Sequence, residues 1–387
     1  MNHNIEPKPS ILIADDDRST RSLLRLILKK DGYQVIEVAN GEECLAAWQE
    51  LQPDMILLDA MMPVMDGFSC CQQINQPENN SNIPILMITG LNDKESVDRA
   101  FAVGATDYIT KPIHPPVLRQ RLARILKAAE AEAALKASEA KLLEQNLKLQ
   151  AELDRAADYV RSLLPKPTKE KIKVEQHFAP SAQLGGDIFD HYWLDDNHLA
   201  VYLVDVAGHG VMSALLSISV LNVLRSQSLY NTDFYEPWTV LTELNRLFQM
   251  NEKGDNYFTI WYGVISLSDR QLVYASAGHP PAILSRQQGV KYLNNDNIPI
   301  GMFDEYPFEQ NICTFETGDR LYVLSDGVYE VPQANGKLWG FDNLVKLLAK
   351  DRDSNNFNLE NIWRFIQKQH HAQILDDDFS LLKIILK

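Results

Sequence analysis

Residues 11–17 read ILIADDD, so four apolar residues run directly into three aspartates. A short buried strand that ends in carboxylates is typical of a parallel sheet whose ligand site lies at the carboxyl ends of the strands. Helical patterns such as residues 21–30 separate further apolar runs at 34–38, 55–58, 85–88 and 107–110. This alternation predicts a doubly wound α/β domain with a five-stranded parallel sheet over residues 1–124.

Five polar residues fall at one edge of this predicted sheet, because each ends or follows a strand: Asp15, Asp16, Asp59, Thr89 and Lys111. A single aspartate at a strand end often only caps a helix. The carboxyl ends of parallel strands meet, however, so the five residues together indicate a site.

This set suits a divalent cation and a phosphoryl group. Hard cations prefer oxygen ligands, so we expect the three aspartates to hold Mg²⁺ together with the backbone carbonyl of Met61. Asp59 is then a carboxylate nucleophile that forms an aspartyl phosphate. Lys111 and Thr89 would contact the phosphoryl oxygens through charge and hydroxyl.

Four stretches resemble the receiver domain of two-component response regulators: ILIADDD, LLDAMMPVMDG at 57–67, MITG at 87–90 and YITKP at 108–112. The resemblance implies that a histidine kinase or a phosphotransfer protein phosphorylates Asp59. It also implies that Thr89 and Tyr108 are switch residues that move afterwards.

A seven-residue period follows from Ile125 and predicts a coiled-coil linker over residues 125–164. Its more apolar series is Ala128, Leu135, Leu142, Leu149, Ala156 and Leu163, and the mixed series three residues earlier is Ile125, Glu132, Glu139, Asn146, Leu153 and Val160. We expect a parallel homodimer with a marginal seam. The alternative is a single solvated helix that lies against a domain. Pro165 and Pro167 end the helix.

Residues 165–387 carry strand-like runs with helical patterns between them, which predicts a layered α+β sandwich. The strand-like runs are 173–178, 199–206, 258–266, 271–276, 321–325 and 380–386, and the helical patterns are 212–226, 237–250, 341–350 and 359–371.

Acidic residues again mark strand ends in this half. Asp187 follows two glycines, Asp205 precedes Val-Ala-Gly-His-Gly, Asp326 precedes a glycine, and three aspartates occupy 376–378. Glycine beside aspartate lets the backbone approach a phosphate or a metal-bound water. Carboxylates from distant segments can bridge two divalent cations, which lower the pKa of a shared water. The absence of a histidine or cysteine cluster from the sequence favours Mn²⁺ or Mg²⁺ over zinc.

These stretches, with YASAGHPPAIL at 274–284 and LYVLSDGVYE at 321–330, resemble the bacterial branch of the metal-dependent protein phosphatase 2C superfamily, the stage II sporulation and stress-response phosphatases. The resemblance implies that Asp205 bridges both metals, that the Val206 carbonyl joins the second, and that Asp326 and Asp377 complete one shell. Asp187 would contact the metals mostly through water. The attacking group would be the bridging water.

Two histidines have open roles. His209 is either a general acid or a structural hydrogen-bonding group, and the pattern does not decide between them. His279, in a Gly-His-Pro-Pro turn, is expected to be structural.

The sequence therefore predicts a response regulator whose output is a serine/threonine phosphatase. The resemblance implies that its substrate is a phosphorylated anti-sigma-factor antagonist. The alternative is a phosphatase fold that serves as a phosphorylation-switched binding scaffold. A nucleotide cyclase with a Gly-Gly-Asp-acid-Phe motif does not fit, because Ile188 occupies the acidic position.

Composition agrees with this class. The net charge of −15 argues against nucleic acid or an anionic membrane surface as a partner. The sequence shows no apolar leader and no membrane-length apolar stretch, so we expect a cytoplasmic protein.

Overall fold

The computed structural model describes residues 8–79, 82–90, 94–168, 171–208, 210–249, 257–333, 336–350, 358–369 and 377–387. Its chain divides into two compact units, Met1–Asn146 and Leu147–Lys387. Over the described ranges, no helix combines the length and the apolar character that a membrane crossing requires.

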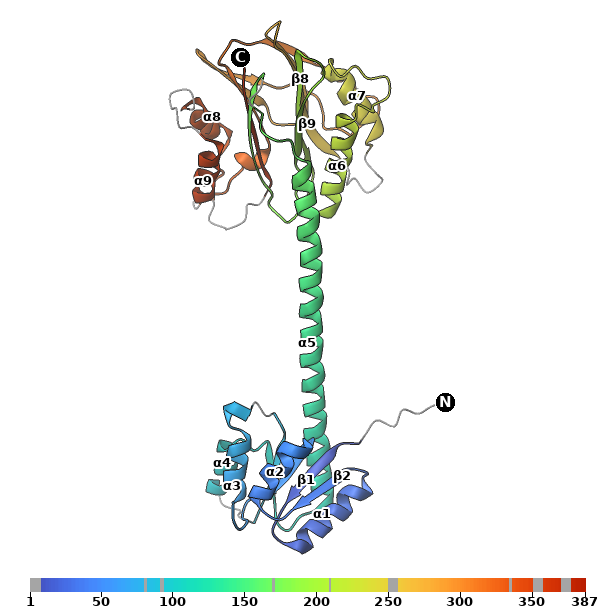
Figure 1. Ribbon diagram of the computed structural model, residues 1–387, viewed down its shortest axis with the longest axis vertical. Coiled ribbons are helices and arrows are strands. Elements are labelled where there is room, and N and C mark those ends of the chain that lie inside the picture. The colour runs from blue at the N-terminus through green and yellow to red at the C-terminus, as the bar shows by residue number, and fades with distance from the viewer. Residues whose placement is uncertain are drawn as a thin grey trace. The chain divides into compact units, whose positions relative to one another are not determined.

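The first unit is a five-stranded parallel sheet with strand order β2-β1-β3-β4-β5, as predicted. Helices lie on both of its faces (Figure 1). Its strands are β1 (Ser10–Ala14), β2 (Gln34–Val38), β3 (Met55–Asp59), β4 (Ile85–Thr89) and β5 (Asp107–Thr110), and its helices are α1 (Arg18–Lys30), α2 (Gly41–Leu51), α3 (Gly67–Ile74), the short η1 (Pro77–Asn79), α4 (Lys94–Ala102) and the first part of α5 (Pro115–Leu163).

The central strands are apolar on both sides because both faces are covered. Leu12 and Ile56 pack with residues of α2 and α3, whereas Ile11 and Leu57 pack with residues of α1 and α5. Asp17, the last residue of the opening motif, caps α1 by accepting hydrogen bonds from two backbone N–H groups of its first turn.

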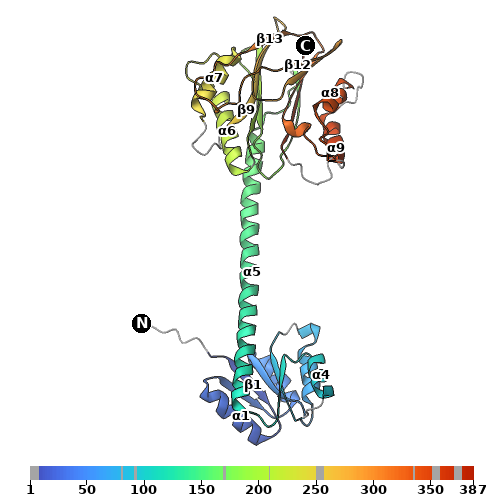
Figure 2. The same ribbon diagram turned by 180° about the vertical axis from the view of Figure 1, so that it is seen from behind.

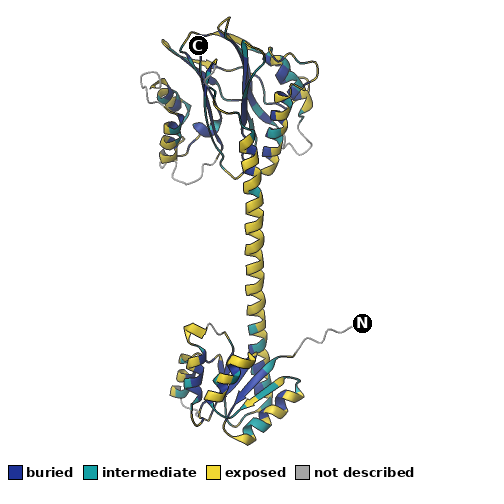
Figure 3. Ribbon diagram, in the orientation of Figure 1, coloured by how far each residue is buried: buried dark blue, intermediate teal, exposed yellow. Residues whose placement is uncertain are grey.

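Helix α5 begins at Pro115, ten residues before the predicted linker. Near its start, Ile125 is buried in the core of the first unit. Near its end, Val160 is buried against residues of the second unit. Residues 130–152, between these two regions, are all exposed (Figure 3). Both ends of the predicted seam are therefore used for packing within the chain.

The described part of the second unit contains two antiparallel five-stranded sheets, with strand orders β13-β10-β9-β8-β7 and β12-β11-β14-β15-β6. Its strands are β6 (Lys173–Ala179), β7 (Ile188–Trp193), β8 (His198–Val206), β9 (Phe258–Ser266), β10 (Gln271–Ala277), β11 (Ala282–Arg286), β12 (Gly289–Leu293), β13 (Asn311–Thr314), β14 (Arg320–Leu324) and β15 (Phe379–Ile385), and its helices are α6 (Val211–Arg225), α7 (Pro237–Leu247), the short η2 (Asp326–Val328), α8 (Phe341–Ala349) and α9 (Leu359–Gln369).

The two sheets pack face to face, and helices cover their outer faces. Trp261 of the first sheet and Val323 of the second belong to the core between the sheets. The outer face of the first sheet packs against α6 and α7, and that of the second against α8 and α9. Views from both sides show these layers (Figures 1 and 2). The predicted α+β sandwich is confirmed.

Candidate functional site

The structure brings the first acidic set together at the carboxyl edge of the parallel sheet. Carboxylate oxygens of Asp15, Asp16 and Asp59 lie within 4.8 Å of one another. The Lys111 ammonium is 3.0 Å from Asp15 and 2.9 Å from Asp59. This donor set fits a divalent cation beside a nucleophilic carboxylate.

The electrostatics of this edge favour a bound cation. Burial raises the pKa of Asp59, and the neighbouring Asp15 and Asp16 add to the rise, although Lys111 opposes it. Burial acts to lower the pKa of Lys111, but its hydrogen bonds to Asp59 and Asp15 raise the pKa on balance. A divalent cation would offset the repulsion among the carboxylates.

The remaining predicted residues of this unit are Thr89, Tyr108 and Met61. Thr89 ends β4 and is buried, and its carbonyl accepts a hydrogen bond from the Lys111 backbone N–H. Tyr108 lies in β5, where its ring meets Phe101 edge to face at 5.9 Å between centroids. Met61 is exposed two residues after Asp59.

A glycine makes room for the Asp59 loop. A Cβ atom at Gly67 would lie 2.0 Å from the carbonyl oxygen of Asp59. No side chain fits at this distance, so glycine is required where α3 begins.

The second acidic set surrounds a cavity of about 230 Å³ in the second unit. Asp205 lies near the end of β8, Asp326 is the first residue of η2, and Asp377 lies in the segment just before β15. Val206, the other predicted ligand residue, also lines this cavity. Three of the four predicted aspartates therefore meet at one cavity although they are far apart in sequence.

Charge repulsion and burial act strongly on these acids. Burial, followed by the charges of Asp326 and Asp377, raises the pKa of Asp205 to about 8. Burial also raises the pKa of Asp326, and Glu330 adds to that rise. Among the described residues, the Oδ1 atom of Asp326 and the Oδ2 atom of Asp187 are buried without a hydrogen-bond partner. Such oxygens fit cation ligands.

Asp187 is not among the residues that line this cavity. It is 2% exposed, and burial together with the charge of Asp205 raises its pKa well above the usual range. Within the described ranges, the triad of Asp15, Asp16 and Asp59 alone gathers three carboxylate ligand atoms within 4.8 Å.

Asp378, which the sequence left within an acidic run, is a structural part of the site. It is 3% exposed and accepts hydrogen bonds from the backbone N–H groups of Ser181, at 2.8 Å, and Asp187, at 3.1 Å. A Cβ atom at Gly185 would lie 2.2 Å from its Oδ2 atom. The Gly-Gly-Asp turn therefore closes around this carboxylate. In the sequence, this turn was marked by its two glycines, Gly185 and Gly186.

The structure describes one of the two histidines, His279, and not the other. His209 lies outside the described residues. His279 is buried, and its Nδ1 atom is 2.7 Å from the hydroxyl of Thr259, which lines the Asp205 cavity. Sequence reasoning missed Thr259, because a threonine within an apolar strand gives no signal of a site.

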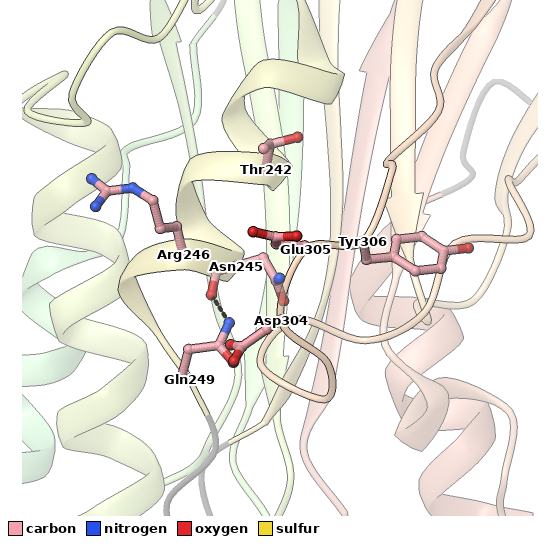
Figure 4. A pocket seen from close by; sticks show the side chains of 7 residues that line it. All are labelled: Thr242, Asn245, Arg246, Gln249, Asp304, Glu305 and Tyr306. Carbon is pink, nitrogen blue, oxygen red and sulfur yellow. Dashed lines mark hydrogen bonds between the residues drawn. The ribbon is translucent and has the colours of Figure 1, made fainter.

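A separate cavity of about 530 Å³ lies between α7 and the segment that follows Ile300 (Figure 4). Its wall is held by Asn245, whose Nδ2 donates to the Phe303 carbonyl and whose Oδ1 accepts from the Gly301 N–H. The residues that line this cavity include no predicted site residue.

Protein-family models match both halves of the chain. A family described as "Response regulator receiver domain" matches residues 11–123, and one described as "Stage II sporulation protein E (SpoIIE)" matches residues 195–387. The chain is a response regulator with a SpoIIE-family domain. The parallel sheet is thus its receiver domain, and the two-sheet sandwich carries its SpoIIE-family domain.

Individual relatives are similar over part of the chain. Phosphoserine phosphatase RsbP of Bacillus subtilis (strain 168) is 31% identical over 248 residues, which are 62% of this chain and 59% of that protein. Transcriptional regulatory protein AfsQ1 of Streptomyces coelicolor is 32% identical over 200 residues, 49% of this chain and 84% of that protein. The probable transcriptional regulator ycf27 of Guillardia theta is 37% identical over 32% of this chain and 48% of its own length.

The fold of the second unit has a solved counterpart. The SiaA-PP2C domain of Pseudomonas aeruginosa is similar with a TM-score of 0.55 and 19% identity, over 63% of this chain and 99% of that chain. This likeness supports the fold assignment.

Proposed function

We propose that the SpoIIE-family domain is a metal-dependent protein serine/threonine phosphatase that the receiver domain controls. The observation that carries the proposal is the cavity at which Asp205, Asp326 and Asp377 meet. The pKa values of Asp205 and Asp326 are raised. The carboxylate oxygens of the three aspartates suit Mn²⁺ or Mg²⁺, which would activate a water molecule for attack on a phosphoryl group. RsbP, which is 31% identical over 62% of this chain, is named a phosphoserine phosphatase.

The residues of the chain have distinct roles in this proposal. Asp205, Asp326 and Asp377 would hold the metals, with the carbonyl of Val206 as a further ligand. Asp187, which does not line the cavity, would act through water. By resemblance, the substrate would be a phosphorylated anti-sigma-factor antagonist. Hydrolysis would then change which protein the anti-sigma factor holds.

Control would start at Asp59, which a histidine kinase or phosphotransfer protein would phosphorylate beside Mg²⁺ and Lys111. A phosphoryl group adds negative charge next to Thr89. Thr89 and Tyr108 would then move as switch residues. The altered receiver surface would change how two copies of the chain pair through α5.

The last turns of α5 offer a route to the catalytic loops within the second unit. Ala157 and Val160 pack with Leu184 and with Ala214 of α6. Leu184 directly precedes the Gly-Gly-Asp turn, and its carbonyl accepts a hydrogen bond from Gly210 N–H, beyond the Asp205 strand. A shift of α5 would therefore reach the segments that carry both Asp187 and Asp205.

The connection is reinforced at the end of α5. Arg225, the last residue of α6, donates to the Leu163 carbonyl at 2.9 Å and to the buried Asp190 at 2.7 Å. The arginine thus joins the end of α5 to strand β7.

Hydrolysis by the full-length protein tests the proposal. With Mn²⁺ present, we expect release of phosphate from p-nitrophenyl phosphate and from phosphoserine peptides. Acetyl phosphate should change the rate about 5-fold or more, the usual range of coupling between two sites. Asp59→Asn should remove this response, and Glu50→Gln, an exposed carboxylate on α2, should keep it. Stable binding of a phosphorylated partner without turnover would support the scaffold instead.

Pairing of α5 is a separate prediction. Leu135, Leu142 and Leu149 recur every seven residues and are 59%, 58% and 57% exposed in the single chain. Burying such a stripe against a second copy is favourable by about 25 cal/mol per Å² of apolar surface. Sedimentation should therefore give a dimer for the wild type and a monomer for Leu142→Glu, whereas Lys141→Glu should remain a dimer. A monomeric wild type would contradict the coiled coil.

A further inference from the structure

A threonine and a histidine form a hydrogen-bonded pair at the wall of the Asp205 cavity. Thr259 lines this cavity, and its hydroxyl lies 2.7 Å from His279 Nδ1. Thr259 is the second residue of β9, and His279 follows β10 after Gly278, whose φ of 64° turns the chain. The pair therefore joins the start of β9 to the end of β10.

The sheet register places the Thr259 hydroxyl on the side of the carboxylate. Asp205 and Thr259 are directly opposite one another in the antiparallel pair β8–β9. Side chains of such a pair lie on the same face with Cβ atoms about 4.5–5.5 Å apart. The flanking Phe258 and Ile260 pack in the core beneath α6 and α7, so Thr259 faces the space between the two sheets.

The protonation state of His279 follows from its surroundings. Burial lowers the pKa of His279 to about 3, so the imidazole is neutral and carries one N–H. Its Nε2 atom is buried and forms no hydrogen bond in the described chain. The Leu324 backbone also acts on the ring, but it raises the pKa less than burial lowers it. A buried N–H without a partner is rarer than a buried lone pair without one.

The hydrogen is therefore assigned to Nδ1, which donates to the Thr259 oxygen. This leaves the hydroxyl hydrogen of Thr259 available to the cavity. Neither lysine nor arginine occurs among the residues found to line that cavity. A hydroxyl is thus a suitable neutral donor for a phosphoryl oxygen there.

We propose that the Thr259 hydroxyl donates a hydrogen bond to a phosphoryl oxygen of the substrate, and that His279 holds this hydroxyl in position. The inference rests on the proposed phosphatase function. Thr259 touches the substrate and is a catalytic residue, whereas His279 acts through Thr259 and is a positioning residue. A fixed donor stabilises the charge that develops on the phosphoryl oxygens during attack.

Steady-state hydrolysis of p-nitrophenyl phosphate with saturating Mn²⁺ tests the catalytic role. Thr259→Val keeps the shape of the side chain and removes the hydroxyl, so kcat should fall about 10²-fold with KM little changed. Thr259→Ser keeps the hydroxyl and should retain most of the activity. Wild-type kcat in Thr259→Val would overturn the proposal.

A double-variant cycle tests the positioning role. His279→Leu should lower kcat about 10-fold, as loss of a supporting hydrogen bond typically does. Adding His279→Leu to Thr259→Val should cause no further loss, because both act through one hydroxyl. His279→Asn, whose amide offers a donor near the position of Nδ1, should restore most of the rate. Additive losses, or a fall in Tm with no rescue by asparagine, would show that His279 is only structural.

Phosphate binding separates this inference from the phosphatase proposal. If the wild type hydrolyses nothing, the proposed activity has failed, and inorganic phosphate is then titrated into the Mn²⁺-loaded protein by calorimetry. Thr259→Val should bind phosphate about 10-fold more weakly than the wild type, the value of one hydrogen bond to a charged group. Equal affinities would overturn the role of Thr259 independently of turnover.

Discussion

Asp205→Asn is expected to slow phosphate release strongly while it stabilises the metal-free protein. Asp205 comes from the end of β8 and shares its cavity with Asp326 and Asp377. An amide cannot replace the charge of a carboxylate that holds cations and the attacking water. Hydrolysis of p-nitrophenyl phosphate with Mn²⁺ should therefore fall on the order of 10²–10³-fold.

The gain in stability follows from the raised pKa of Asp205. Its pKa is about 8 in the fold, against a usual value of 3.8. As the pH rises from about 4 to about 8, the unfolded chain ionises freely while the folded chain holds its proton, so this carboxyl makes folding progressively less favourable. Above about pH 8 the penalty is complete. The Tm of Asp205→Asn should exceed that of the wild type at pH 9, and the difference should shrink as the pH falls.

Mn²⁺ should reverse the order of the Tm values of the wild type and Asp205→Asn. Mn²⁺ binds only the folded protein with its ligands in place, so it should raise the wild-type Tm and have much less effect on the variant. Asp196→Asn, an exposed carboxylate that pairs with Lys171, makes the same chemical change elsewhere and should alter neither property. Full activity of Asp205→Asn would mean that the Asp205 cavity is not the catalytic centre.

Several strands buried on both sides were predictable because their apolar runs are continuous, although β11 (Ala282–Arg286), which is also buried, was not predicted. The runs at 199–206 and 258–266 match β8 and β9 within one residue at each end. β7 was missed since it contains Asp190 and His191, and Asp190 is buried only because Arg225 comes from α6 to pair with it. That partner is 35 residues away, and local patterns do not show it.

Edge strands were missed for a different reason. β12 and β13 lie at the outer edges of their sheets and are largely exposed, so their residues lack a continuous apolar run. The alternation of polar and apolar residues in strands of four or five residues is too short to distinguish them from loops.

The linker shows what a seven-residue repeat cannot predict. A seven-residue repeat marks an apolar stripe, but it does not say which molecule covers each part. The structure assigns Ile125 to the receiver core and Val160 to the second unit, and leaves Leu135, Leu142 and Leu149 exposed. The repeat therefore combines two packing surfaces within the chain with one free stripe.

The aspartates that meet at the Asp205 cavity were predictable because each is tied to a glycine or a strand end, whereas the residues that support them were not. Asp377 and Asp378 are adjacent and chemically identical, yet one is exposed at the cavity and the other is 3% exposed behind it. Only the tertiary contacts of Asp378 with Ser181 and Asp187 distinguish them.

This difference gives the second large prediction: Asp378→Asn should destabilise the fold, and Asp377→Asn should not. The Asp378 carboxylate accepts from Ser181 N–H at 2.8 Å, Ser181 Oγ at 3.1 Å and Asp187 N–H at 3.1 Å. An asparagine amide would place an NH₂ group against one of these donors. Each hydrogen bond to a charged acceptor is worth about 1.5–3 kcal/mol, so we expect a loss of about 2–4 kcal/mol.

Thermal unfolding and hydrolysis should together give opposite patterns for the variants Asp378→Asn and Asp377→Asn. Asp378→Asn should lower the Tm by roughly 5–15 °C, and its activity should fall because the Gly185–Asp187 turn loses its anchor. Asp377→Asn should keep the wild-type Tm without metal and lose most of its Mn²⁺-dependent hydrolysis. Equal Tm values for the two variants would contradict the structural role of Asp378. Full activity in Asp377→Asn would remove it from the metal ligands, since the side chain has no other part in the proposed reaction.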